Sequence, residues 1–341
     1  MKLFSPKSTQ PLSKLVKPNK RLILKPSEAI KKSTIKDELD FIKSTSIIRV
    51  CVYRGCGGIG DILMMTPLLQ AIKESYPDCR LTVAIDTKSA GDTYYEVLKN
   101  NPYIDEIVSA HECKKETYHL FKDISSVCLA YENSGLPWIN RIDIFANSCG
   151  FKLKDPKVFY EVEEDESLWA DEMLKKWKKD DNTKFIMLHT ASYDVKRTWP
   201  IQRYIELIHY INTKRRDIVF LVNDFQGLYP NWNAIKNVVN ITPYKIRQKA
   251  AITSKVDCFL GPDSGPMHIA GALNVKGLIM FGSIPPNSRI NHYPSLQSIT
   301  TTGLACLGCG YKSCPVNIKC MTSLSSEKVA DKLLGILNEN I

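Results

Sequence analysis

The chain of 341 residues lacks any long uninterrupted apolar run. No segment approaches the roughly 20 apolar residues that a membrane-spanning helix needs, so the sequence predicts no transmembrane helix. The N-terminus carries lysines but neither a continuous apolar core nor a small-residue cleavage site, so we expect no signal peptide. A composition of 44% hydrophobic and 24% charged residues is typical of soluble globular proteins, and we expect a cytoplasmic location.

The sequence also contains no D-x-D triplet of the kind that carries a catalytic divalent ion. Any chemistry of this chain is therefore expected to be independent of a bound metal ion. Aromatic residues are not interleaved with the basic residues, as they are on many nucleic-acid-binding surfaces. A nucleic acid is therefore not an expected partner.

Positive charge, by contrast, is abundant and unevenly placed. Residues 1–43 contain eleven lysines and arginines against four acidic residues, which is +7 of the formal net charge of +10. With its prolines and few large apolar side chains, this segment predicts a basic N-terminal extension over residues 1–46. Two interpretations stay open. It is a solvated extension, or it makes a peripheral contact with anionic lipid headgroups at the inner face of the membrane or with an acidic glycan.

The most informative stretch is VDCFLGPDSGPMHIAGALNVKGLIMFG, residues 256–282. A short apolar strand is followed by Asp263 and Ser264, then by a helix, and a second apolar strand closes the segment. This order forms the βαβ unit of a parallel sheet. Ligands of such sheets bind at the carboxyl end of a strand, where the N–H groups of a helix N-terminus suit a phosphate. The alternative is that Asp263 or Ser264 only caps the helix.

A second unit of the same kind begins near residue 47. The β-branched strand IIRVCVYR runs into a turn with four glycines and then into a helix that starts near Asp61. The glycines allow a tight turn and a close approach of a ligand to the backbone. A helix N-terminus stabilises the charged form of a carboxylate, so we expect Asp61 to be an available base. A simple N-cap is the alternative.

Strands and helices alternate through most of the chain, which predicts an α/β protein with two Rossmann-like parallel-sheet domains facing each other across a cleft. The first domain is expected over residues 47–160 and the second over residues 184–341. A connecting segment that contains a helix, residues 161–183, lies between them. Within the first domain, residues 62–77 are predicted to form one continuous helix.

Four segments, in this order, resemble the heptosyltransferase family (glycosyltransferase family 9). GGIGDILMMTPLLQAIKESYPDCRLTV resembles its opening motif, and FIMLHTASYDVKRTWPIQRYIELI resembles the start of its second domain. GPDSGPMHIAGALNV is similar to its nucleotide-sugar motif, and CLGCGYKSCPVNIKCM to its cysteine-bearing C-terminus. The resemblance covers about residues 47–338. It implies the GT-B fold, with an acceptor-side first domain and a second domain that binds the nucleotide sugar.

The resemblance also implies roles for individual residues. Members of the family invert the configuration at the anomeric carbon of the sugar, which implies one in-line displacement. Asp61 would be the general base for the acceptor hydroxyl, and Lys196 would neutralise the charge of the leaving diphosphate. The residues expected to bind the donor are Gly58, Gly60, Thr190, Ser192, Asp263, Ser264, Gly265, Met267 and His268. Thr190 departs from the family pattern, because many members carry a smaller residue there.

The implied function is an inverting, metal-independent glycosyltransferase of lipopolysaccharide biosynthesis. It would move heptose from ADP-heptose to a surface glycan, a glycolipid or a protein side chain, with no cofactor for catalysis. Two alternatives stay open: a non-catalytic scaffold or binding protein that has kept the fold, and a transferase that uses another nucleotide sugar.

Four of the eleven cysteines form a separate cluster, the four-cysteine knob of residues 306–320: Cys306, Cys309, Cys314 and Cys320. Four close thiolates suit a tetrahedral metal ion, zinc first and iron second, and four protein ligands would make such a site structural. Iron-bearing cysteine fingers occur in the branch of the family that modifies autotransporter proteins. Disulfides and unliganded thiols are the alternatives, and a cytosolic enzyme argues against disulfides.

Overall fold

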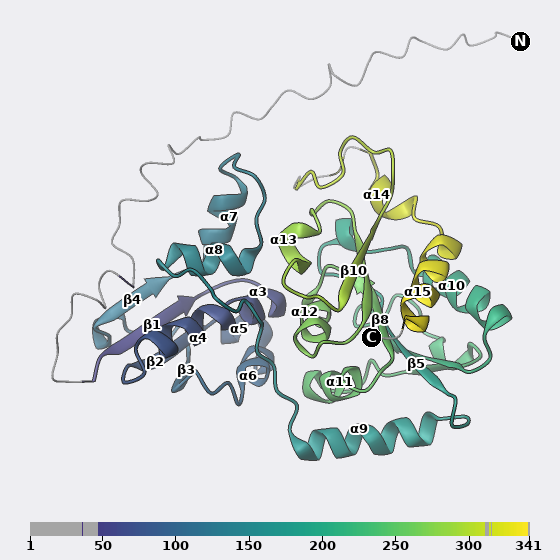
Figure 1. Ribbon diagram of the computed structural model, residues 1–341, viewed down its shortest axis with the longest axis horizontal. Coiled ribbons are helices and arrows are strands. Elements are labelled where there is room, and N and C mark those ends of the chain that lie inside the picture. The colour runs from purple at the N-terminus through teal and green to yellow at the C-terminus, as the bar shows by residue number, and fades with distance from the viewer. Residues whose placement is uncertain (1–35, 37–46, 311–313, 315, 340–341) are drawn as a thin grey trace, which may run out of the picture.

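The computed structural model describes residue 36, residues 47–310, residue 314 and residues 316–339. It contains two all-parallel sheets, and Figure 1 shows the two α/β domains side by side. The predicted α/β class with two parallel-sheet domains is confirmed. The basic N-terminal extension lies outside the described residues apart from Lys36, and the domain boundaries stay predictions. Within the described ranges, no helix is both long enough and apolar enough to cross a membrane.

The first sheet has four strands in the order β3-β2-β1-β4. They are β1 (Arg49–Arg54), β2 (Arg80–Ile85), β3 (Glu106–Ser109) and β4 (Leu120–Asp123). The two central strands, β1 and β2, are almost completely buried, as expected for parallel strands covered on both faces. The helices of this domain are α3 (Ile59–Met64), α4 (Thr66–Ser75), α5 (Thr87–Ala90), α6 (Thr93–Leu98), α7 (Val127–Glu132) and α8 (Arg141–Ser148).

The single helix predicted over residues 62–77 is wrong, because the chain forms two helices, α3 and α4, that meet at Met65. The cause is Pro67, which has no N–H to donate to the carbonyl of Leu63. The hydroxyl of Thr66 donates to that carbonyl instead, at 2.8 Å. The break makes α3 a separate short helix, which packs against α12 of the second domain.

The second sheet has six strands in the order β10-β9-β8-β5-β6-β7. They are β5 (Lys184–His189), β6 (Ile218–Asn223), β7 (Val238–Asn240), β8 (Cys258–Pro262), β9 (Gly277–Phe281) and β10 (Leu296–Thr300). Its helices, with the connecting α9, are α9 (Glu164–Trp177), α10 (Ile201–Lys214), α11 (Ile246–Thr253), α12 (Gly265–Ala272), α13 (Asn287–Ile290), α14 (Lys319–Thr322) and α15 (Ser326–Asn338). The strand order reverses between β5 and β8, and in the first sheet between β1 and β4. Open α/β sheets bind ligands at such switch points.

Glycines allow the two domains to approach closely where α3 meets α12. A Cβ on Gly60 of α3 would lie 2.5 Å from Cδ2 of His268, and a Cβ on Gly265 of α12 would lie 2.8 Å from Cβ of Ile59. Either contact is too short for real carbon atoms. The two glycine-bearing motifs, which are about 200 residues apart in the sequence, therefore fit together only without side chains at these positions.

A buried ion pair ties the domains together at the lower end of their interface in Figure 1, where α6 lies beside α11. Arg247 of α11 donates two hydrogen bonds to Glu166 of α9, both at 2.6 Å. The same guanidinium donates to the backbone carbonyls of Glu96 on α6 and of Glu161, at 3.2 and 3.1 Å. The largest apolar core is continuous across the two domains.

We expect Gly60→Ala to destabilise the protein, although alanine favours helices. The new methyl group would press on the imidazole of His268, and overpacking of this kind costs about 1–3 kcal/mol. Gly335→Ala in α15 is the matched control, because no atom lies within 4 Å of its added Cβ. This control is expected to gain up to about 1 kcal/mol from helix propensity. Urea unfolding measures both changes, and equal effects of the two substitutions would contradict close packing at Gly60.

Candidate active site between the two domains

The predicted base, Asp61, is the third residue of α3, and Gly58 is the N-cap. Its Oδ1 lies 2.6 Å from Nη1 of Arg141 and 3.4 Å from Nη2 of Arg54, while its Oδ2 accepts a hydrogen bond from the Gly58 N–H at 3.2 Å. Burial alone would raise the pKa of the Asp61 carboxyl. Arg141 and then Arg54 outweigh burial and hold that pKa well below its usual range. The carboxylate is therefore charged, as expected, with the arginines as the main reason.

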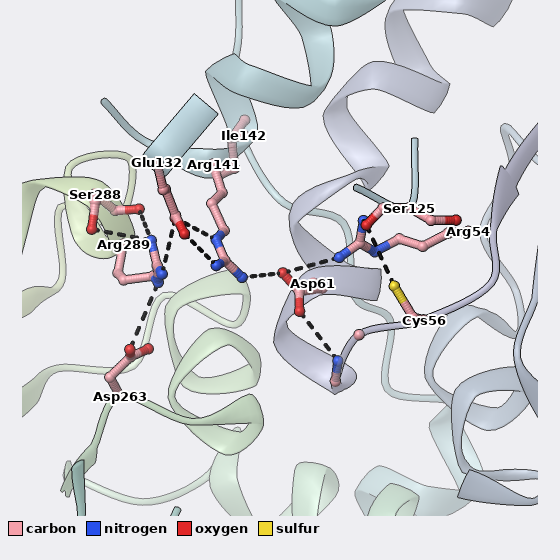
Figure 2. A network of polar contacts seen from close by, with 12 residues as sticks. Arg54, Cys56, Asp61, Ser125, Glu132, Arg141, Ile142, Asp263, Ser288 and Arg289 are labelled. Carbon is pink, nitrogen blue, oxygen red and sulfur yellow. Dashed lines mark hydrogen bonds and ion pairs between the residues drawn. The ribbon is translucent and has the colours of Figure 1, made fainter. Parts of the chain in front are cut away.

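Asp61 belongs to a chain of alternating charges that crosses from the first domain to the second (Figure 2). Arg141 donates to Glu132 through two nitrogens, at 2.7 and 2.8 Å. Glu132 lies 3.2 Å from Nη2 of Arg289, whose Nε is 3.7 Å from Asp263. Asp263 also accepts a hydrogen bond from Arg197 at 3.1 Å. In spatial order the charge chain is Arg54, Asp61, Arg141, Glu132, Arg289, Asp263 and Arg197.

The side chains of this charge chain are largely buried, with exposed fractions between 3% for Asp263 and 27% for Arg197. Burying a charge is costly unless an opposite charge lies beside it, and the alternation supplies one at every step. Four guanidinium groups and three carboxylates leave a net charge of +1. The excess of positive charge favours an anionic ligand in this part of the interface between the domains.

The second predicted motif places Asp263 directly before α12. Burial would raise the pKa of Asp263, but Arg289 and Arg197 outweigh it and lower that pKa. Ser264 is the N-cap residue of α12, as the alternative interpretation allowed, but its hydroxyl donates to the carbonyl of Pro262 at 3.2 Å and makes no capping hydrogen bond. The first turn of α12 therefore has no side-chain cap within the described part of the chain.

Three further predicted donor residues belong to α12 itself. Gly265 is its first residue, and Met267 is completely buried in the core, so both offer only backbone groups to a ligand. His268 is buried beside Gly60, and its Nδ1 lies 2.9 Å from the hydroxyl of Tyr293. Burial lowers the pKa of His268 to about 4, so the ring is neutral at pH 7.

The predicted residues of the β5 loop are held by groups of the protein itself. The hydroxyl of Thr190 donates to Asp224 at 3.0 Å, and the N–H of Ser192 donates to Thr198 at 3.1 Å. Nζ of Lys196, in the short 3-10 helix η3 (Val195–Arg197), lies 3.3 Å from Asp194. The neighbouring Arg197, which the sequence analysis did not select, is the residue that reaches Asp263.

The structure thus brings Asp61, Gly58 and Gly60 together with the α12 motif, whereas Lys196 lines the pocket of the four cysteines. Sequence reasoning missed Arg54, Arg141, Glu132 and the roles of Arg197 and Arg289. Arg54 precedes the glycine turn directly, which is a usable local signal. Glu132 and Arg141 carry no such signal, because the partners that explain them lie in other segments.

The four cysteines line one small pocket, which Lys196 and Ser283 also line. Burial and the nearby thiols raise the pKa of Cys320. The thiol donors suit zinc or iron, but in the described ranges no group of three or more His, Cys, Asp or Glu side chains is arranged to hold a metal ion. The predicted metal site is therefore not supported by this arrangement, and we derive no chemical step from it.

We expect Arg141→Gln to reduce the free energy of unfolding by about 3 kcal/mol at pH 7, because it removes one partner of a buried ion pair. Asp61 has a depressed folded-state pKa, so its contribution is present above the unfolded pKa near 4 and is lost as the pH falls further. The difference between wild type and variant should therefore shrink below about pH 4. Urea unfolding of wild type and variant at several pH values measures this difference in the free energy of unfolding.

Arg80→Gln is the control for this substitution, because the Arg80–Glu106 pair is exposed, with side-chain exposures of 57% and 43%. Such pairs contribute at most about 1 kcal/mol. A cost of Arg141→Gln that is no larger than that of Arg80→Gln, or that does not change with pH, would argue against the ion pair with Asp61.

Known proteins resemble this chain in sequence and in fold. The family model of glycosyltransferase family 9 (heptosyltransferase) matches residues 131–317. The chain is 32% identical over 161 residues to lipooligosaccharide heptosyltransferase 2 of Campylobacter jejuni, and this alignment covers 44% of the chain and 50% of the relative. The chain thus spans about half the length of that curated relative.

Two solved structures have the same fold. A glycosyl transferase family 9 protein from Veillonella parvula has a TM-score of 0.64 at 16% identity, covering 86% of this chain and 98% of that one. The iron-containing dodecameric glycosyltransferase TibC from enterotoxigenic E. coli has a TM-score of 0.62 at 14% identity, with coverages of 87% and 77%. TibC has also been solved in complex with ADP-D-beta-D-heptose.

At these identities the structural likeness establishes the fold alone, and the predicted GT-B arrangement is confirmed. The family itself rests on the sequence match, which spans more than half of the 341 residues and contains Glu132, Arg141, Asp263 and Arg289. The protein belongs to glycosyltransferase family 9, the heptosyltransferase family.

Proposed function

We propose that this protein is an inverting glycosyltransferase that moves heptose from ADP-heptose to a lipopolysaccharide-type acceptor. The observation that carries the proposal is the meeting of two motifs in one interdomain site. A charged carboxylate, Asp61, lies at the start of α3, and the uncapped N-terminus of α12 packs against the same helix. Family membership supports the transfer of a sugar.

In the proposed reaction, Asp61 accepts the proton of the acceptor hydroxyl. The hydroxyl oxygen attacks the anomeric carbon in one in-line step, and the bond to the diphosphate breaks. A carboxylate with a strongly depressed pKa is a weak proton acceptor. Proton transfer is therefore proposed to be late, after the attacking oxygen has begun to bond to the anomeric carbon and its proton has become acidic, while Arg141 stays beside Oδ1 of Asp61.

The leaving diphosphate is proposed to lie at the N-terminus of α12. Backbone N–H groups of its first turn would donate to the diphosphate there, although Pro266 has none to donate. Arg197 and Arg289, which flank Asp263, add positive charge to the same region, and Lys196 is proposed to approach the diphosphate by leaving Asp194. This set of donors stabilises the charge that develops on the leaving group without a divalent ion.

Two comparisons support heptose and ADP-heptose as the sugar and the donor. The curated relative is a lipooligosaccharide heptosyltransferase, and TibC has been solved with ADP-D-beta-D-heptose. For the acceptor we propose a lipopolysaccharide or lipooligosaccharide core. Another surface glycan, a glycolipid and a protein side chain are the remaining candidates. The reaction is proposed to occur in the cytoplasm, with the basic N-terminal extension at the inner face of the membrane.

We expect Asp61→Asn to lower kcat by about 10²–10⁴-fold, because the amide keeps the shape of the side chain but cannot take the proton. Donor affinity should change little. Transfer or hydrolysis of ADP-heptose, with UDP- and GDP-sugars beside it and no divalent metal added, gives kcat, and calorimetry gives the donor affinity. Asp171→Asn on the exposed side of α9 is the control and should leave both unchanged.

The outcomes separate the proposal from its two alternatives. Wild type that binds no nucleotide sugar would contradict the proposal and favour the scaffold. Turnover of a different nucleotide sugar would keep the mechanism and replace the donor. Full activity of Asp61→Asn with ADP-heptose would leave the transferase in place but assign the base to another group.

The four cysteines are proposed to hold a structural zinc or iron ion once their thiols draw together around it. The convergence of Cys306, Cys309, Cys314 and Cys320 on one pocket supports this proposal, as does the thiolate chemistry of the two metals. Since all four ligands would come from the protein, the ion would stabilise the knob beside Lys196 and take no part in the transfer.

We expect purified wild type to contain about one zinc or iron ion per chain, as a four-thiolate structural site would hold. Cys309→Ser should lose most of this metal, because three thiolates bind it less tightly. Cys56→Ser, which changes an exposed thiol outside the knob, should retain it. Elemental analysis by mass spectrometry decides the question, and metal-free wild type would leave the cysteines as unliganded thiols.

A further inference from the structure

Glu132, the last residue of α7, occupies the centre of the charge chain (Figure 2). Its side chain is 9% exposed. Both carboxylate oxygens accept hydrogen bonds from Arg141, at 2.7 and 2.8 Å, and Oε1 also lies 3.2 Å from Nη2 of Arg289. A single carboxylate thus contacts one arginine from each domain.

Each of these arginines contacts one of the two carboxylates that the sequence motifs identify. Arg141 donates to Asp61 at 2.6 Å in the first domain, and Nε of Arg289 lies 3.7 Å from Asp263 in the second. Glu132 touches neither Asp61 nor Asp263. It connects them through the two guanidinium groups, and it is the link at which the charge chain passes from one domain to the other.

The two arginines would repel each other without a negative charge between them. Arg289 is fully enclosed, and burial followed by the charge of Arg141 lowers the pKa of its guanidinium, while Asp263 and Glu132 act in the opposite sense. With Glu132 neutral, the net charge of the chain would rise from +1 to +2. The hydrogen bonds that fix the plane of the Arg141 guanidinium would also be weakened.

We propose that Glu132 is a positioning residue for the transfer reaction. It holds Arg141 in contact with Asp61, and Arg289 beside Asp263. The carboxylate of Glu132 therefore fixes the positions of both the proposed base on the first domain and the donor-side carboxylate on the second. This inference rests on the proposed function for its catalytic consequence, but the coupling between Glu132 and Asp61 is a property of the protein alone.

The test compares Glu132→Gln with Glu166→Gln. Glu166 forms a similar pair with Arg247, with two hydrogen bonds of 2.6 Å and little exposure, in the same interface but away from Asp61.

Glu132→Gln is expected to lower kcat about 10- to 100-fold, because a base misplaced by about 1 Å loses rate on this scale. The KM for the donor should change far less. Glu166→Gln should lower stability to a similar degree and leave kcat within about twofold, because no hydrogen bond or ion pair joins Glu166 to the charge chain within the described ranges. Equal kcat values for the two variants would overturn the proposal.

A second measurement needs no turnover. Urea unfolding gives the change in the free energy of unfolding for Asp61→Asn, Glu132→Gln and the double variant. The two single changes should not add up to the change in the double variant, because both side chains act on Arg141. The pair Asp61→Asn with Glu166→Gln should be additive. Additive changes in the free energy of unfolding for both pairs of substitutions would contradict the coupling between Glu132 and Asp61. Absence of transfer by wild type would instead contradict the proposed function, while this cycle still decides whether Glu132 acts on Asp61.

Discussion

The ion pairs that run from Arg54 to Arg197 are the interaction on which the arrangement of the two domains depends. A buried charge without a partner is far more destabilising than a buried pair is stabilising. Each domain therefore supplies partners for the charges that the other domain buries at the interface. The first domain buries Arg141 and Glu132, and the second supplies Arg289 and Asp263 to continue the alternation. The position of the base follows from the position of the interface.

The close approach of α3 and α12 makes this alternation geometrically possible. Gly60 and Gly265 have no side chains, so the start of each helix lies against the other domain. Gly57 contributes in a different way: its φ of +113° is unfavourable for other residues, and a Cβ there would meet Arg54 at 2.7 Å and Asp61 at 3.0 Å. The glycines of the first motif thus serve the protein's own ion pairs as well as any ligand.

The parts of the fold that could be predicted are those whose signals are local. The strands β1 and β8 are apolar runs that end in polar turns, and each is followed by the helix that the sequence predicts. The division between α3 and α4 was missed because Pro67 lies in an otherwise regular helical pattern. The charge chain could not be predicted, because Arg141 and Asp61 are 80 residues apart in the sequence. Nothing near Glu132 indicates that an arginine of the other domain will face it.

The Arg247 contact and the charge chain lie at opposite ends of the interface. At the lower end in Figure 1, one guanidinium binds α9 and two backbone carbonyls, and the apolar core is continuous between the domains. At the upper end the contacts are polar, and His292, which follows α13, lies 2.9 Å from Asp143 of α8. Exposing an apolar core to water costs more free energy than replacing polar contacts between side chains by contacts with water. A rotation of one domain relative to the other is therefore expected to pivot about the continuous apolar core, and the displacement would grow with distance from that core. A rotation too small to disturb the pivot would lengthen the Glu132–Arg289 pair first, so the transfer site lies where a small change in the angle between the domains has its largest effect.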